Sequence, residues 1–301
     1  MQTERRLGEV ADLELTHNER QAFRTSYRIG GPAALSATAH TYSALAQALA
    51  ILEEEKAEWA ILGRGSNVLV ADRGYDGCVV RLGREFTHVT IGEENDVITV
   101  GGAMQLPRLL ATCQKKGLSG LEMCAGVPGS LGGAISMNAG TRREWVSKRV
   151  SSLVTLCPGQ GLKRYDAADL DWGYRHCSIP GGEVILEATF EVEKTSPAEV
   201  AADMERLMSR RRRHQPFNKP SCGSVFRNPP ELAAGRLIES CGLKGAKVGD
   251  AQISEVHANF VINNGHASAN DVLTLITMMH DEVLKRHGID LVPEVKFLGF
   301  R

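Results

Sequence analysis

The 301-residue sequence predicts an α+β protein. Two observations support this class. Short β-branched runs separated by glycine and aspartate dominate the chain up to about residue 195, whereas helical periodicity and fewer strands follow. A chain of this length can form one large domain or two to three smaller ones. We expect the helix predicted at 196–214 to mark the main boundary.

The first half begins with an amphipathic helix from Thr41, where Leu45, Leu49 and Leu52 recur at helical spacing. A second helix is predicted from Pro107 to the glycine stop at residue 117. Between and after these helices we expect strands at residues 59–62, 68–71, 78–82, 86–91 and 96–100, and again across 150–192.

The pattern changes at Ser196. Ser196, Pro197 and Glu199 form a capping box with proline at the first helical position, which predicts a helix that ends near residue 216. A last long helix is predicted at 270–287 and is stopped by Gly288. The second half is therefore the more helical one.

Composition and charge exclude several classes of protein. Hydrophobic residues make up 43% and charged residues 24%, and the net charge is −1, so no global cationic field is available for nucleic acid or a membrane. No stretch has the length of a membrane-spanning helix or the pattern of a signal peptide. The seven cysteines form an odd set without a C-x-x-C pair, which argues against disulfides and against a metal site. We expect a cytoplasmic protein.

The first motif with chemical potential is GRGSN at 63–67, which lies between two predicted strands. A dinucleotide fingerprint would open a helix at this point, so this motif is not a Rossmann turn. Two interpretations stay open: a nest of backbone N–H groups that binds an anion, and a plain hairpin turn.

The second motif is GVPGSLGGAISMNAG at 126–140. A structural turn has little need of so long an apolar, glycine-rich stretch. A loop that presses its backbone against a flat cofactor and its phosphates does need one. The motif therefore favours contact with a ligand.

Together with four later motifs, these two resemble the UDP-N-acetylenolpyruvoylglucosamine reductase (UDP-N-acetylmuramate dehydrogenase) family. The later motifs are GYRHCSIP (173–180), SCGSVFRNP (221–229), AQISEVHANFVIN (251–263) and LVPEVKFLGF (291–300). The resemblance runs in order from about residue 20 to the end of the sequence.

The resemblance implies a two-subdomain FAD-binding unit of the vanillyl-alcohol oxidase type, followed by an α+β substrate domain. The expected boundaries are 1–83 and 84–195 for the two FAD-binding subdomains, and 196–301 for the connecting helix and substrate domain. The implied activity is the NADPH-dependent reduction, through non-covalent FAD, of a UDP-sugar enolpyruvyl ether in peptidoglycan precursor synthesis. The expected partners are small molecules only, and a monomer is the expected state.

The same resemblance implies the site residues. Three match catalytic positions: Arg175 to stabilise negative charge next to the substrate carboxylate, Ser224 as proton donor, and Glu294 to share the work of Arg175. Substrate contacts are expected from Tyr174 and Asn228, and from His257 and Asn259, for which a structural role in the substrate domain is the open alternative. The cofactor contacts are expected from Gly63, Arg64, Gly65, Ser66, Asn67, Gly126, Val127, Pro128, Gly129, Ser130, Gly132, Gly133 and Ala134.

The sequence departs from the family pattern at two cysteines. Cys177 and Cys222 stand where the family usually has serine and alanine, and Cys222 lies two positions from Ser224. The short span between Arg175 and Ser224 resembles the family's second class, which lacks an extra substrate-covering loop. The basic run at 210–214 is typical of a solvated helix end, with contact to NADPH or UDP phosphates as the alternative.

Two other functions compete with this one. An oxidase of the same fold would often hold its flavin covalently, and a silent UDP-sugar-binding module would lack the catalytic matches. The motifs around Ser224 and Glu294 argue against the oxidase, and the presence of all three catalytic matches argues against the binding module.

Overall fold

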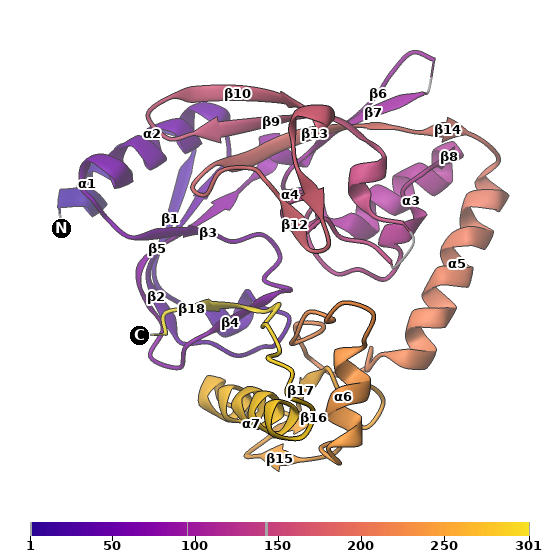
Figure 1. Cartoon of the computed structure of the whole chain (residues 1–301). Helices are drawn as coiled ribbons and strands as arrows, with labels where there is room; N and C mark the ends of the chain where they lie inside the picture. The colour runs from indigo at the N-terminus through magenta and orange to yellow at the C-terminus, as the bar shows by residue number, and fades with distance from the viewer. Residues whose placement is uncertain (1, 95, 142–143, 301) are drawn as a thin grey trace. The chain divides into compact units, whose positions relative to one another are not determined.

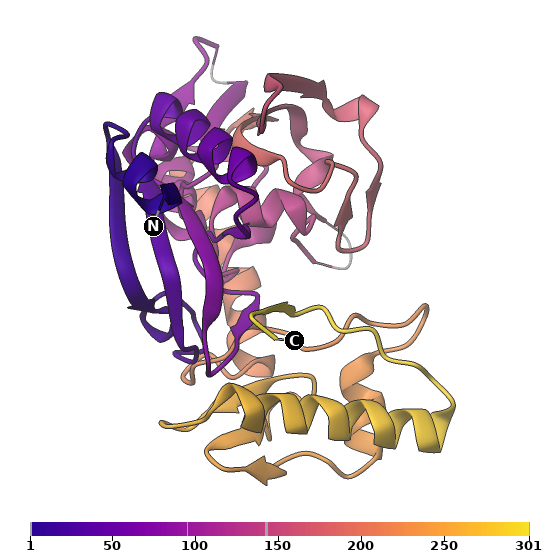
Figure 2. The same ribbon diagram turned by 90° about the vertical axis from the view of Figure 1, so that its left-hand side faces the viewer.

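The computed structural model describes residues 2–94, 96–141 and 144–300 (Figure 1). The chain divides into two compact units. The first contains residues 1–16, 35–64 and 77–210, and the second contains residues 17–34, 65–76 and 211–301. Each unit is therefore built from segments that are separated in the sequence, and the chain passes between the units several times. Figure 2 shows the same ribbon from a second direction.

The first unit has two sheets. A five-stranded antiparallel sheet has the order β10-β9-β13-β7-β6, and β3 pairs in parallel with β5 in a four-stranded sheet of order β1-β2-β5-β3. The strands of these sheets are β1 (Leu13–Arg20), β2 (Pro32–Ala39), β3 (Trp59–Ile61), β5 (Tyr75–Leu82), β6 (Val89–Ile91), β7 (Val97–Gly101), β9 (Val150–Cys157), β10 (Gly161–Asp166) and β13 (Val184–Glu191). Strands β1, β2 and β5 also contribute residues to the second unit.

Helices cover these sheets through their apolar sides. Leu45, Leu49 and Leu52 of α2 are fully buried, as are Leu106 and Leu109 of α3 at 1% exposure. The helices of this unit are α1 (Gln2–Gly8), α2 (Tyr42–Glu54), α3 (Leu106–Lys116), α4 (Leu131–Ser136) and most of α5 (Pro197–His214). Two short strand pairs complete the unit: β8 (Leu118–Ser119) with β14 (Glu193–Lys194), and β11 (Trp172–Gly173) with β12 (His176–Cys177).

The second unit has a separate core around Tyr27, Phe226 and the inner side of α7. Strand β18 near the end of the chain pairs in parallel with β4, and β15, β16 and β17 form a small antiparallel sheet. The elements are β4 (Val68–Val70), α6 (Ala234–Ser240), β15 (Lys247–Val248), β16 (Ala251–Ile253), β17 (Val261–Asn263), α7 (Ala269–His287) and β18 (Lys296–Leu298).

Most sequence predictions of helices are confirmed. Thr41 caps α2, Gly117 ends α3 in the left-handed conformation, and Ser196 and Glu199 form the predicted capping box before α5. The strand expected at 86–91 starts only at Val89, because residues 84–87 form a 3₁₀ turn. The glycine-rich segment at 126–140 contains the short helix α4, where a loop was expected. None of the described helices combines the length and the apolar character that crossing a bilayer requires.

Candidate active site

The two glycine-rich motifs meet in the first unit. A Cβ atom added to Gly63 would overlap the Ser130 hydroxyl oxygen, so the backbone of Gly63 lies directly against the Ser130 side chain. Ser130 begins α4, which carries Gly132 and Gly133 in its first turn. The structure therefore places residues 63–64 beside residues 130–133. The sequence linked each of these segments to a ligand, but it did not show that the two segments are neighbours.

The backbone at this contact has spare hydrogen-bond donors. Among the described residues, the N–H groups of Gly63, Arg64, Ser130 and Gly133 have no acceptor in the protein. Unpaired backbone donors that lie close together bind anionic groups well. A Cβ added to Gly133 would find one heavy atom within 4 Å, the Ser130 hydroxyl oxygen at 3.6 Å, so there is open space beside this glycine. Both features fit the phosphates and flat ring of a dinucleotide cofactor.

The rest of the GRGSN motif belongs to the second unit. Gly65 has a left-handed φ of 64°, and a Cβ there would overlap the Arg24 carbonyl oxygen, so the fold itself requires this glycine. The Asn67 side-chain amide donates to the Glu294 carbonyl oxygen at 3.1 Å, and the Lys296 N–H donates to the Asn67 carbonyl oxygen at 3.0 Å. Asn67 thus fixes the segment that carries Glu294.

Ser224 and Glu294 lie on neighbouring segments of the second unit. The Glu294 N–H donates to the Val225 carbonyl oxygen at 2.7 Å, and the Arg227 N–H donates to the Val292 carbonyl oxygen at 2.9 Å. Ser224 is half-buried, and its hydroxyl has no hydrogen-bond partner in the described part of the protein. Glu294 is 9% exposed. The segments that carry the proposed proton donor and the carboxyl group are therefore held in fixed register.

Arg175 lies in the first unit, in the turn between β11 and β12. It has a left-handed φ of 57°, an uncommon conformation for a residue other than glycine. Its guanidinium lies over the Tyr174 ring, 5.2 Å from the ring centroid. The Asn138 side chain donates to the Gly173 carbonyl oxygen at 3.0 Å, so the end of the second glycine-rich motif holds the hairpin of Arg175.

The four expected substrate contacts differ in accessibility. Tyr174 is 53% exposed, and Asn228 is half-buried with its side-chain oxygen accepting the Ala234 N–H at 3.0 Å. His257 accepts the Asn259 N–H at its Nδ1 atom, and burial lowers the pKa of its ring. Asn259 is only 2% exposed, and both polar ends of its side chain bind the backbone of Phe226.

The basic run at the end of α5 is mostly exposed, as expected for a solvated helix end. No cluster of metal ligands is present among the described residues.

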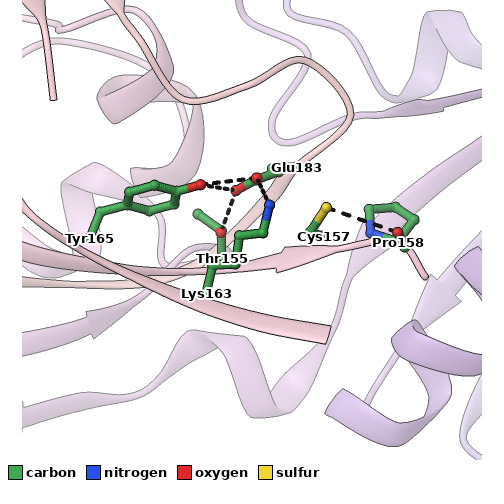
Figure 3. A network of polar contacts seen from close by, with 6 residues as sticks. All are labelled: Thr155, Cys157, Pro158, Lys163, Tyr165 and Glu183. Carbon is green, nitrogen blue, oxygen red and sulfur yellow. Dashed lines mark hydrogen bonds and ion pairs between the residues drawn. The ribbon is translucent and has the colours of Figure 1, made fainter. Parts of the chain in front are cut away.

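One polar network of the first unit was not recognised in the sequence (Figure 3). The Glu183 side chain, 2% exposed, accepts hydrogen bonds from Thr155 at 2.6 Å and from Lys163 and Tyr165 at 3.0 Å. Burial alone would raise the pKa of Glu183, but these three donors together lower it. The carboxylate is fully paired and connects β9, β10 and the start of β13, so the network is part of the framework.

The departure from the family pattern at residue 222 has a structural explanation. Cys222 is 2% exposed and packs in the second core beside the Tyr27 hydroxyl. Burial raises the pKa of its thiol to about 12. A thiol that is buried and protonated is a poor nucleophile.

We therefore expect Cys222 to resist alkylation in the native protein. Brief treatment with iodoacetamide at neutral pH, followed by peptide mass spectrometry, should label the half-buried Cys157 and Cys177 before Cys222. Unfolding in urea should make all seven thiols reactive. Native labelling of Cys222 as fast as that of Cys177 would mean that Cys222 is accessible.

Comparison with known proteins covers nearly the whole chain. Residues 33–158 match an FAD-binding domain, and residues 215–298 match the C-terminal domain of UDP-N-acetylenolpyruvoylglucosamine reductase. The chain is 38% identical to the UDP-N-acetylenolpyruvoylglucosamine reductase of Syntrophobacter fumaroxidans, over 97% of this chain and 86% of that protein. It is also 38% identical to the enzyme of that name from Syntrophotalea carbinolica, over 98% of this chain and 97% of the relative.

Solved structures agree with these relatives. The crystal structure of UDP-N-acetylenolpyruvylglucosamine reductase from Thermus caldophilus matches with a TM-score of 0.82 and 33% identity, over 95% of this chain and 98% of that one. The Physcomitrella patens protein BBE-like 1 matches with a TM-score of 0.58 at 10% identity, over 94% and 88% of the two chains, which shows a shared fold alone. These findings confirm the α+β class, with an FAD-binding part of the vanillyl-alcohol oxidase type and a C-terminal domain. The chain therefore belongs to the UDP-N-acetylenolpyruvoylglucosamine reductase family.

Proposed function

We propose that this protein reduces UDP-N-acetylglucosamine enolpyruvate to UDP-N-acetylmuramate, with NADPH as reductant and FAD as non-covalent cofactor. Family membership supports the overall reaction. The observation that carries the proposal within this chain is the fixed pairing of the Ser224 and Glu294 segments, in which Ser224 keeps an unused hydroxyl. A proton donor must be in place and free of competing partners before the substrate carbon becomes basic.

The cofactor would be held mainly by backbone groups. Residues 63–64 and 130–133 supply unpaired N–H donors, and open space lies beside Gly133. Residues 65–67 and 126–129 belong to the same two motifs, and we assign them to this role as well. A bound FAD would supply the redox chemistry, in which a hydride equivalent passes from NADPH through the flavin to the enolpyruvyl group.

The three catalytic residues would act on the substrate. Addition of a hydride leaves negative charge on the carbon next to the substrate carboxylate. The guanidinium of Arg175 can hold that carboxylate with two parallel hydrogen bonds while the charge develops. The Glu294 carboxyl would share this stabilisation, and the Ser224 hydroxyl would then protonate the carbon.

We also propose which parts of the chain bind the cofactor and which bind the substrate. Residues 1–83 and 84–195 would form the two FAD-binding subdomains, and residues 196–301 the connecting helix and substrate domain. All seven cysteines are free thiols, which supports a reducing, cytoplasmic location. We propose a monomer that uses UDP-sugar and NADPH as its only ligands besides FAD.

One purification tests this function against its competitors. We expect yellow protein that releases free FAD on denaturation and oxidises NADPH only when the enolpyruvyl substrate is present. Flavin retained after denaturation would instead support a covalent flavin oxidase. Colourless protein that binds the UDP-sugar without NADPH oxidation would support a binding module.

The open space beside Gly133 provides a separate test of the cofactor site. We expect Gly133→Leu to lower the FAD content of the purified protein, because the new side chain would occupy space that the protein itself leaves free. The ratio of flavin to protein absorbance measures the FAD content. The thermal unfolding temperature of the FAD-free protein should not fall.

Gly181→Leu is the matched control, because Gly181 also has open space and lies in the same unit, outside both motifs. It should keep full FAD content. Full FAD content in Gly133→Leu would show that α4 is not part of the cofactor site. Gly65 is a poor choice for this test, because a side chain there would collide with the backbone of Arg24.

A further inference from the structure

We propose that Asn259 is a positioning residue for Ser224, and not a substrate ligand. This inference rests on the proposed role of Ser224 as proton donor. Asn259 lies immediately before Phe260 and β17, in the second unit, which also contains Ser224. It acts through the backbone of the segment on which Ser224 is carried.

The contacts of Asn259 define this role. Its side-chain oxygen accepts the Phe226 N–H at 3.0 Å, and its side-chain nitrogen donates to the Phe226 carbonyl oxygen at 2.8 Å. Its main-chain oxygen accepts the Val225 N–H at 2.8 Å. One asparagine thus satisfies three backbone groups of the two residues that follow Ser224.

The same segment also sets the position of Glu294. The Val225 carbonyl oxygen accepts the Glu294 N–H at 2.7 Å, and Phe226 forms a bridge with Pro293. Because Asn259 fixes Val225 and Phe226, it indirectly fixes the register between the segments of Ser224 and Glu294. A small error in the position of a reacting group, about 1 Å, can lower a rate by about 10²-fold.

Burial excludes the alternative in which Asn259 binds substrate directly. The residue is 2% exposed, and both ends of its amide are already occupied by Phe226. A ligand could reach this amide only by displacing buried backbone hydrogen bonds, which are costly to break.

The chain offers a closely matched control in Asn263. This asparagine is also 2% exposed, lies in β17, and makes three side-chain hydrogen bonds to backbone: it donates to the Tyr27 carbonyl oxygen at 3.0 Å and accepts the N–H groups of Gly265 and Ala267 at 2.8 and 3.1 Å. It holds a loop without a proposed catalytic group. Asn263→Ala should therefore report the general cost of losing a buried asparagine.

The experiment compares Asn259→Ala with Asn263→Ala in the FAD-loaded protein. We expect reoxidation of the reduced flavin by UDP-N-acetylglucosamine enolpyruvate to slow by about 10²-fold in Asn259→Ala only. Flavin reduction by NADPH, and the dissociation constant of the substrate from the oxidised enzyme, should stay at wild-type values. Stopped-flow absorbance and equilibrium titration of the flavin spectrum give these three quantities.

Hydrogen exchange gives a readout that does not depend on activity. The backbone amides of Val225 and Phe226 should exchange faster in Asn259→Ala and at the wild-type rate in Asn263→Ala. If Asn259→Ala does not yield folded protein, Asn259→Asp serves instead. It keeps an oxygen that can accept the Phe226 N–H, and we expect a smaller loss in the same step.

The outcomes separate this inference from the proposed function. If the substrate dissociation constant rises in Asn259→Ala while the reoxidation rate at saturating substrate is normal, Asn259 is a substrate ligand and the inference is wrong. If Asn259→Ala and Asn263→Ala slowed reoxidation equally, the cause would be general destabilisation, and the inference would be wrong. If Ser224→Ala also reoxidises at the normal rate, the proton-donor role itself fails and the inference fails with it.

Discussion

Ser224→Ala should slow reoxidation of the reduced flavin by the enolpyruvyl substrate by about 10² to 10⁴-fold, the usual contribution of a positioned general acid. Reduction of the flavin by NADPH should remain nearly unchanged, because that step delivers no proton to a substrate carbon. The structure supports this separation: the Ser224 hydroxyl has no other partner in the described chain, and its segment is held by Asn259 and the Glu294 strand.

Stopped-flow absorbance of the flavin follows both steps. Ser221→Ala is the matched control, since Ser221 lies three residues earlier on the same segment. In the described part of the chain it forms hydrogen bonds only through its carbonyl oxygen, which accepts the Ser26 hydroxyl at 2.6 Å. It should behave as wild type in both steps. If Ser224→Ala slowed the NADPH step and left reoxidation intact, Ser224 would belong to the nicotinamide site.

Arg175→Lys should lower the rate of the same reoxidation step by about 10² to 10³-fold, the range found when one preorganised donor to a developing negative charge is removed. It should also weaken substrate binding, because lysine keeps the charge but loses the planar fork that binds a carboxylate with two hydrogen bonds. Glu294→Gln should impair this step without the same loss of binding. The measurements are the substrate dissociation constant and the reoxidation rate at saturating substrate.

Arg164→Lys controls for a general effect of replacing arginine in the first unit. Arg164 is an exposed residue of β10 that donates to the Ser152 hydroxyl at 3.2 Å, and no catalytic role is assigned to it. Normal substrate binding and reoxidation in Arg175→Lys would show that no bidentate contact is made there.

Local signals predicted the elements that carry their own caps and periodicity. The helix after Thr41, the stop at Gly117 and the capping box of Ser196 and Glu199 each depend on residues within a few positions, so they could be found in the sequence. Strands β15, β16 and β17 were not predicted, because each is only two or three residues long. Their pairing is decided by tertiary contacts that periodicity does not report.

The candidate site shows the same limit. Motifs identified the glycine loops and the residues Arg175, Ser224 and Glu294 as candidates, but they did not show what holds these residues. Asn138 binds the hairpin of Arg175, Asn67 binds the segment of Glu294, and Asn259 binds the segment of Ser224. Each contact joins residues that are between 33 and 227 positions apart. Spacing in a single sequence cannot reveal such pairs.

The second unit is assembled from three segments that are far apart in the sequence, and this limits when it can fold during synthesis. Strand β18 pairs with β4 across more than 200 residues, and the Asp72 carboxylate accepts the N–H groups of Ala269 and Asn270 at the start of α7. Residues 17–34 and 65–76 therefore cannot form all their native contacts until residues 296–298 have been synthesised. A fragment that begins at residue 211 would lack Tyr27 and Leu69 of its own core, as well as the partner strand of β18. On the ribosome, this unit therefore completes its fold only after residues 296–298 have been made, although residues 17–34 are synthesised early.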